Sequence, residues 1–303
     1  MKSIAISFTL FASVLQGLVW GEPLAHIDEQ SALQAGEQLI ERRRFTDAIQ
    51  LLIQVLPEIV DREHQALVVH LLGRAEFESG RFRLAKQYFE KAARLWPQPE
   101  QQAADLANLG RTYLELGEYS HAEATLRQAL REPLPRAAVA WHDLGQVLAL
   151  QGRRKEAHEA FGRAAEQADI SLKVSIWSDL AAIHVAEGDR RRAHELMLRA
   201  LALAPPGQKH ARIAANIGVL LAEMKDREGG LRWLRQALSE MESAMGPEHP
   251  DVAQILEDSE QVLHRTGRRT EAAQYRQRLA AIRAAHPDER RATEQSVDWR
   301  ALR

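Results

Sequence analysis

Histidine and acidic side chains are the first residues of this sequence to test for catalysis or metal binding. The twelve histidines are spread along the chain rather than clustered, and the sequence contains no cysteine. His158 and His194 are each followed by Glu, but neither has the second histidine four residues on that an HExxH zinc helix requires. The sequence also lacks a glycine-rich phosphate loop and a GxSxG nucleophile elbow. We therefore expect no catalytic residues, no metal and no cofactor.

The composition is that of a folded protein without a strongly charged partner. Hydrophobic residues make up 45% of the 303 positions, and the formal net charge is −2. A sequence this apolar can bury a core, and its near-neutral charge gives no reason to expect nucleic acid as a partner. Without cysteine there are no disulfides or thiolate metal sites, so packing must supply the stability.

The first residues, MKSIAISFTLFASVLQGLVWGEPLA, have the pattern of a secretory signal peptide. Lys2 precedes an apolar stretch from Ile4 to Val19, and Val19 and Gly21 stand three and one residues before a cut ahead of Glu22. The alternative is an uncleaved membrane anchor, but a spanning helix needs about 20 predominantly apolar residues and this stretch is marginal. We expect residues 1–21 to be removed, no membrane span afterwards, and a secreted or periplasmic protein.

Small residues recur along the rest of the chain at a nearly constant interval. Gly73 and Gly110 are 37 residues apart (110 − 73), and so are Ala85 and Ala122 (122 − 85). The Ala column continues through Ala48, Ala85, Ala122, Ala157, Ala193, Gly230 and Ala272. Twelve positions earlier stand Gly36, Gly73, Gly110, Gly145, Ala181 and Gly218, and then Glu260 breaks the column. Four positions after the Ala column stand the large residues Leu52, Phe89, Leu126, Phe161, Met197 and Leu234, and then Arg276.

Each repeat reads as two helices. Apolar residues recur with helical spacing, as at Trp141, Leu144 and Leu148, and no segment alternates long enough to be a strand. In five repeats a glycine then interrupts the pattern where a left-handed helix cap is expected, at Gly80, Gly117, Gly152, Gly188 and Gly267. Because glycine inside a helix costs about 1 kcal/mol relative to alanine, its recurrence predicts a close approach of two helices. The large residue is expected to fill the space beside that crossing.

This pattern resembles the tetratricopeptide repeat family over residues 29–286. The best-matching repeat has Leu72, Gly73, Gly80, Ala85, Phe89, Ala92 and Pro97 at the family's motif positions. The resemblance implies an all-α fold, a right-handed superhelical α-solenoid of about seven helix-turn-helix units. We place these units at 29–62, 66–99, 103–136, 138–171, 174–207, 211–244 and 253–286, and expect a flexible charged tail at 287–303.

The last repeat is less regular than the others. GPEHPDVAQIL, from Gly246 to Leu256, resembles the segment between repeats of kinesin-light-chain-type tetratricopeptide repeats. Ser259, Glu260 and Arg276 replace three buried positions of the pattern. A capping repeat with a polar outer face explains them, because solenoid ends need one for solubility; a loosely packed, degenerate repeat is the alternative.

In the resembled family, the first helices line a concave groove that binds proteins or peptides. The residues that fall on this groove by position are His70, Arg74, Asn108, Arg111, His142, Asp143, Gln146, Asp179, Arg212 and Asn216. Arg74 and Arg111 hold equivalent positions, and two neighbouring guanidiniums would suit a carboxylate. The family's carboxylate clamp is matched only at Asn108 and Asn216. We predict an exported non-catalytic scaffold; an accessory subunit of an envelope enzyme or assembly complex, or a self-associating envelope protein, is the alternative.

Overall fold

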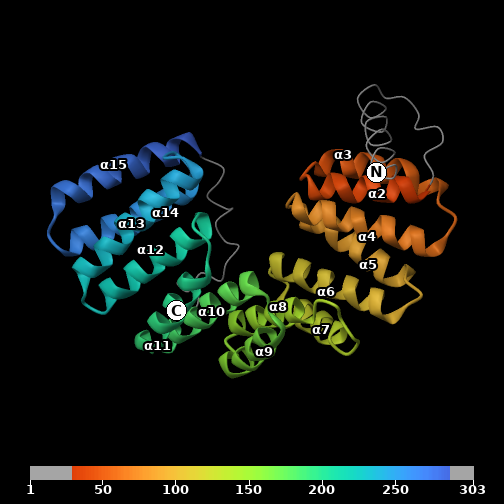
Figure 1. The fold of residues 1–303 in the computed structure, drawn as a ribbon, viewed down its shortest axis with the longest axis horizontal. Helices are drawn as coiled ribbons and strands as arrows, with labels where there is room; N and C mark the ends of the chain where they lie inside the picture. Colours follow the sequence, from red (N-terminus) through yellow and green to blue (C-terminus); the bar gives the residue numbers. More distant parts are fainter. Residues whose placement is uncertain (1–28, 287–303) are drawn as a thin grey trace, which may run out of the picture. The chain divides into compact units, whose positions relative to one another are not determined.

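The computed structural model describes residues 29–286, and this part of the chain is all α (Figure 1). It contains fourteen α-helices, a short 3-10 turn η1 and, within 29–286, no strand. The predicted signal peptide at 1–21 and the predicted tail at 287–303 lie outside the described residues. The helices are α2 Glu29–Glu41, α3 Phe45–Val55, α4 Arg62–Glu78, α5 Phe82–Leu95, α6 Pro99–Glu115, α7 Tyr119–Ala129, α8 Ala137–Leu150, α9 Arg154–Gln167, α10 Ile170–Ala186, α11 Arg190–Leu203, α12 Gln208–Glu223, α13 Arg227–Met245, α14 Pro250–Arg265 and α15 Arg269–Ala285, with η1 at Leu56–Glu58.

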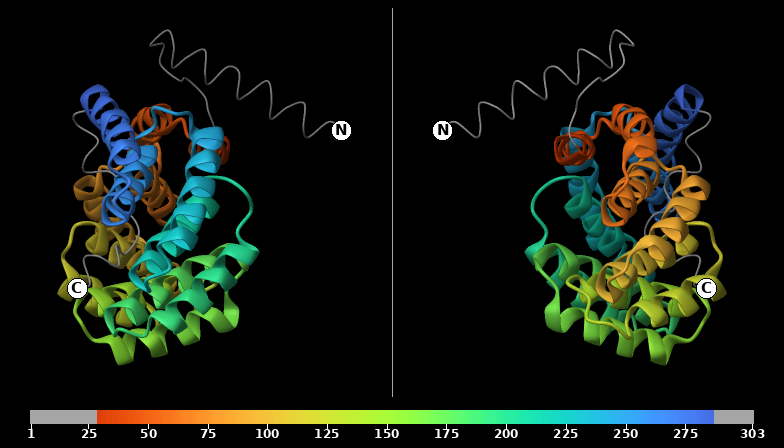
Figure 2. Two further views of the ribbon diagram at one scale, coloured as in Figure 1. Left: turned by 90° about the vertical axis from the view of Figure 1, so that its left-hand side faces the viewer. Right: turned by 90° about the vertical axis from the view of Figure 1, so that its right-hand side faces the viewer.

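The chain divides into two compact units, residues 1–147 and 148–303. In the first unit α2 packs on α3, α4 on α5 and α6 on α7, and each pair also contacts the next. In the second unit α10 packs on α11, α12 on α13 and α14 on α15 in the same way. Figures 1 and 2 show these consecutive helices side by side within each unit. No helix of residues 29–286 is both long and apolar enough to cross a bilayer.

The glycine that ends the first helix of a pair has the predicted left-handed backbone. The φ angles are +76° at Gly80, +73° at Gly117 and +84° at Gly188. A residue with a side chain would be strained by this backbone conformation, although no neighbouring atom lies within 4 Å of an added Cβ. Two repeats reach the same conformation without glycine, with φ of 58° at Arg43 and 74° at Lys225. The repeat register therefore fixes the turn even where the favoured residue is missing.

The small-residue column makes a close contact with the partner helix, as the sequence predicted. A methyl group added at Gly73 would come within 2.8 Å of the Phe89 ring, and one at Gly110 within 2.6 Å of Leu126 Cγ. The large side chain of the partner helix thus fills the space at the glycine. The same contact joins Gly36 to Leu52.

In the pair α12 and α13 the helices come closer still. A methyl group at Gly218 would lie 2.9 Å from the carbonyl oxygen of Gly230, besides meeting Leu234 at 2.8 Å. Glycine stands in both columns here, and the two backbones touch. This is the close approach that the sequence predicted for the whole column.

The last pair packs as part of the second unit. Val252, Ile255 and Leu256 of α14 share one buried cluster with residues of α12 and α13. The buried Ser259 hydroxyl donates to the carbonyl of Ile255 at 2.7 Å. The well-packed core supports the interpretation as a capping repeat over a loosely packed one.

The irregular residues of this pair contact each other. Arg276 Nε donates to Glu260 Oε1 at 3.1 Å. These two residues occupy the positions of the glycine and the large residue in other repeats, 16 residues apart (276 − 260). An ion pair therefore replaces the apolar contact at the end of the solenoid.

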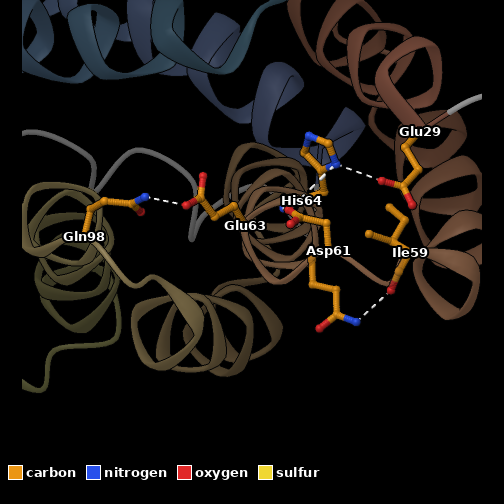
Figure 3. A network of polar contacts seen from close by, with 7 residues as sticks. Glu29, Ile59, Asp61, Glu63, His64 and Gln98 are labelled. Atoms are coloured by element: carbon orange, nitrogen blue, oxygen red, sulfur yellow. Dashed lines mark hydrogen bonds and ion pairs between the residues drawn. The ribbon is translucent and has the colours of Figure 1, made fainter.

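Polar contacts at the start of α4 connect it to its neighbours in the chain (Figure 3). Asp61 caps the helix by accepting from the backbone N–H of His64 at 2.8 Å. His64 Nδ1 lies 2.7 Å from Glu29 Oε2 of α2. Gln98, just before α6, donates to Glu63 at 2.5 Å. The first turns of α2, α4 and α6 are thus joined on one side of the first unit.

Candidate functional site

The two arginines predicted to be neighbours belong to one surface of the first unit. Arg111 of α6 is exposed, and its guanidinium carbon lies 5.1 Å from the centre of the Phe77 ring of α4. Phe77 is one turn after Arg74, so Arg111 lies against the helix that carries Arg74. Arg74 itself is 3.7 Å from Glu37 of α2. Within the described residues, no carboxylate lies within ion-pair distance of Arg111.

The electrostatics of this surface are mixed. Burial raises the pKa of Glu115, one turn after Arg111; the Arg111 charge opposes this effect, and the Asp143 charge adds to it. Glu115 therefore holds its proton more readily than a solvated carboxyl group.

His70, a predicted groove residue, is engaged inside the protein. Its Nδ1 lies 2.6 Å from Oδ1 of Asp105, and Trp96 Nε1 donates to the other carboxylate oxygen at 2.6 Å. Asp105 is fully buried, and the His70 ring packs edge-on against Phe89. A buried carboxylate with two partners stabilises the contact between α4 and α6. His70 therefore contributes to structure here.

Asp105 was not among the residues predicted from the sequence. The repeat register could have found it, because the other repeats have an apolar or small residue at its position in nearly every case. The equivalent residues are Ser31, Val68, Ala140, Ile176, Ile213 and Ile255.

The remaining first-unit candidates differ in accessibility. Asn108 of α6 is half-buried, and its backbone carbonyl accepts from the Thr112 hydroxyl. On α8, His142 and Asp143 are only 7% and 5% exposed, and their nearest ionisable atoms are 3.7 Å apart. Gln146 is half-buried. Little of His142 or Asp143 can contact a partner without a side-chain rearrangement.

In the second unit the candidates gather around a lysine that was not predicted. Burial lowers the pKa of Lys209; Asp179 opposes this effect, and Arg212 adds to it. Lys209 Nζ donates to the Ser175 hydroxyl of α10 at 2.8 Å. Asp179 is buried and Arg212 exposed, while Asn216 on the next turn of α12 is half-buried. The structure thus brings Asp179 and Arg212 into one electrostatic neighbourhood.

The histidines are not all dispersed in space, contrary to the sequence-based expectation. His158 of α9 and His184 of α10 have ring centres 5.0 Å apart. Glu187, which caps the C-terminus of α10, lies beside both. These residues belong to different helices, and 26 residues separate the two histidines (184 − 158), so no local motif signals their contact.

The described helices form consecutive pairs. In most pairs a small residue, a large residue and a turn residue with left-handed backbone recur at fixed positions, which is the pattern of a helix-pair repeat protein. Three tetratricopeptide repeat models match the sequence, at residues 64–131, 108–171 and 210–251. The chain therefore belongs to the tetratricopeptide repeat family. The narrower likeness of its last repeat to kinesin light chains stays a prediction.

Solved structures with the same fold cover most of the chain. The apo form of RapI has a TM-score of 0.67 at 16% identity, with 86% of this chain and 78% of that chain covered. The apo quorum sensor NprR from B. thuringiensis has a TM-score of 0.63 at 12% identity, covering 90% and 97%. PilF of Pseudomonas aeruginosa has a TM-score of 0.55 at 20% identity, covering 75% and 94%. At these identities the likeness concerns the fold. No curated protein matches the sequence significantly.

Proposed function

We propose that this chain is an exported, non-catalytic scaffold that binds a protein or peptide segment through the first helices of its repeats. In the first unit the binding surface is centred on Arg74 and Arg111. Membership of the tetratricopeptide repeat family supports an interaction role, since its stacked helix pairs present extended surfaces for partners.

The observation that carries the proposal is the packing of the Arg111 guanidinium. Its guanidinium packs over the Phe77 ring at 5.1 Å. An aromatic ring orients a guanidinium and leaves its N–H edges available, which reduces the entropy lost on binding. Those N–H groups match the two oxygens of a carboxylate. We therefore infer that the partner offers an acidic side chain or a C-terminal carboxylate.

Arg74 extends the same surface. Its ion pair with Glu37 is long, at 3.7 Å, and both side chains are substantially exposed. Such a pair contributes little to stability, so exchanging Glu37 for a carboxylate of the partner costs little. Arg74 can therefore contribute to binding without loss of the fold.

Export is supported by the sequence of the first 21 residues alone. A basic residue, an apolar stretch and small residues before Glu22 are what a signal peptidase substrate requires. The binding role and the location are separate proposals, and each has its own test.

The binding proposal is tested with synthetic peptides. A pool that varies in acidic content, with free or amidated C-termini, is screened against the purified chain by fluorescence polarisation. Against the tightest peptides, Arg74→Glu/Arg111→Glu should weaken binding at least ~10-fold, equivalent to about 1.4 kcal/mol. Arg74→Gln/Arg111→Gln, which places no new acid beside Glu37, should weaken it in the same direction.

The matched control makes the same change of charge on a second helix. Arg83 and Arg94 are exposed on α5, so Arg83→Glu/Arg94→Glu should retain the affinity of the wild type. Circular dichroism checks that all variants fold. An equal loss in the control, or no loss in the Arg74/Arg111 variants, contradicts the assignment of the surface.

A further inference from the structure

We propose that His158, His184 and Glu187 form a binding site for a divalent transition-metal ion of the zinc type, between α9 and α10. This site is independent of the proposed peptide surface, which is centred on α4 and α6. All three residues belong to the second unit.

The geometry already approaches that of a metal site. One ligand atom from each residue can be chosen so that all lie within 4.8 Å of one another. His184 Nδ1 is 3.3 Å from Glu187 Oε2, and His158 Nε2 is 4.0 Å from the same oxygen. Two ligands bound to one tetrahedral zinc ion at about 2.1 Å are roughly 3.4 Å apart. His184 and Glu187 meet that spacing, and the partly exposed His158 needs only a small rotation.

His184 has a buried nitrogen without a hydrogen-bond partner. Its Nδ1 is shielded from solvent and makes no hydrogen bond to the described residues, and it is one of two such side-chain atoms found among them. An unsatisfied buried polar atom is costly, so a native protein that keeps one has usually left a place for a ligand, ion or water. The lone pair of a neutral imidazole nitrogen is also what a metal ion binds.

The equivalent positions in other repeats show that a histidine is not needed for packing. Most repeats have leucine there, at Leu39, Leu148, Leu221 and Leu263. Where the residue is polar it has a partner: Glu76 pairs with Arg81, and the Tyr113 hydroxyl donates to Glu90 at 3.1 Å. Among these column residues, only His184 has a buried side-chain atom without a hydrogen bond, and Glu187 Oε2 lies 3.3 Å from that atom.

The chemistry of the three groups selects the class of ion. Two imidazoles and one carboxylate suit zinc, cobalt, nickel or copper, whereas calcium and magnesium prefer oxygen ligands. An imidazole binds a metal ion in its neutral form, so binding should weaken as the pH falls. Three protein ligands leave a fourth position for water or for a group from a partner.

The test is a zinc titration of the purified, untagged chain by isothermal titration calorimetry. We expect one equivalent of Zn²⁺ to bind in the presence of excess Mg²⁺, and the thermal midpoint to rise when Zn²⁺ is added. His184→Leu should fold at least as stably as the metal-free wild type and should bind Zn²⁺ at least ~10-fold more weakly. His158→Ala should lose affinity to a similar extent.

His194 provides the matched control. It occupies the position of His158 one repeat later (194 − 158 = 36), where the residue equivalent to His184 is Leu221. His194→Ala should bind Zn²⁺ like the wild type. The site is refuted if the wild type binds no Zn²⁺, or if folded His184→Leu and His158→Ala bind it as tightly as His194→Ala does.

Discussion

Gly218 occupies a place where even one additional methyl group has no room. The methyl would meet Leu234 at 2.8 Å and the Gly230 carbonyl oxygen at 2.9 Å, and a backbone atom cannot move aside as a flexible side chain can. Overpacking of this kind typically costs 1–3 kcal/mol, so we expect Gly218→Ala to lower the free energy of unfolding by about 2 kcal/mol. Urea denaturation followed by circular dichroism measures the change.

Gly162 gives the opposite result and serves as the control. It lies exposed within α9, and nothing lies within 4 Å of an added methyl group. Gly162→Ala should therefore raise the free energy of unfolding by about 1 kcal/mol through helix propensity alone. If both alanine variants are stabilised, the close contact between α12 and α13 is wrong.

For individual residues, the sequence predicted structurally important positions more successfully than it predicted their contact partners. The glycine column and its structural role were evident from the repeat, but the contact with Phe89 or Leu126 depends on side-chain direction. Asp105 and His184 were missed because their partners come from other helices. Their signal is a polar residue in a column that is otherwise mostly apolar, which becomes visible only when the repeats are aligned.

At the scale of helices, the backbone conformation at a helix end can be tested at Lys225. It has a φ of 74° where the neighbouring repeat has Gly188 with a φ of 84°. A left-handed residue with a side chain costs about 1–2 kcal/mol, partly offset by the flexibility of glycine in the unfolded chain. We expect Lys225→Gly to stabilise the protein by about 1 kcal/mol, as measured by its denaturation midpoint.

Gly188→Ala is the reciprocal change and should destabilise by a similar amount, since alanine would be forced into the same conformation. A Lys225→Gly variant less stable than the wild type would show that the lysine side chain contributes contacts that outweigh the strain. Arg43, with a φ of 58°, allows the same replacement by glycine to be tested in the first unit.

Helices were the most predictable elements of the chain. Apolar spacing and a glycine between two helical runs are local signals, so the alternation of helices could be read without the structure. The contact between Glu260 and Arg276 in the last pair could not, because each residue looks unfavourable when it is considered alone. Only their contact shows that they compensate each other.

At the scale of the whole protein, the proposal of export makes a simple prediction. Expressed with a C-terminal tag in a Gram-negative host, the chain should appear in the periplasm with Glu22 as its first residue. Gly21→Pro should block this processing, because the signal peptidase needs a small, unconstrained residue before the cut. N-terminal sequencing of the fractionated protein gives the answer.

A conservative change in the same region separates cleavage from a general defect. Gly21→Ala keeps a small residue before the cut and should be processed like the wild type. Wild-type protein that stays in the membrane fraction and begins at Met1 would instead support the uncleaved anchor.

The contact between glycine and the large side chain joins residues of one repeat only. In each case the partners are 16 positions apart, as with Gly36 and Leu52 (52 − 36) or Gly218 and Leu234 (234 − 218). A stretch of DNA encoding one repeat therefore carries both halves of this contact. Duplicating or deleting such a stretch would leave this contact intact in every remaining repeat. The protein could therefore become longer or shorter during evolution without a change in the contact inside each helix pair.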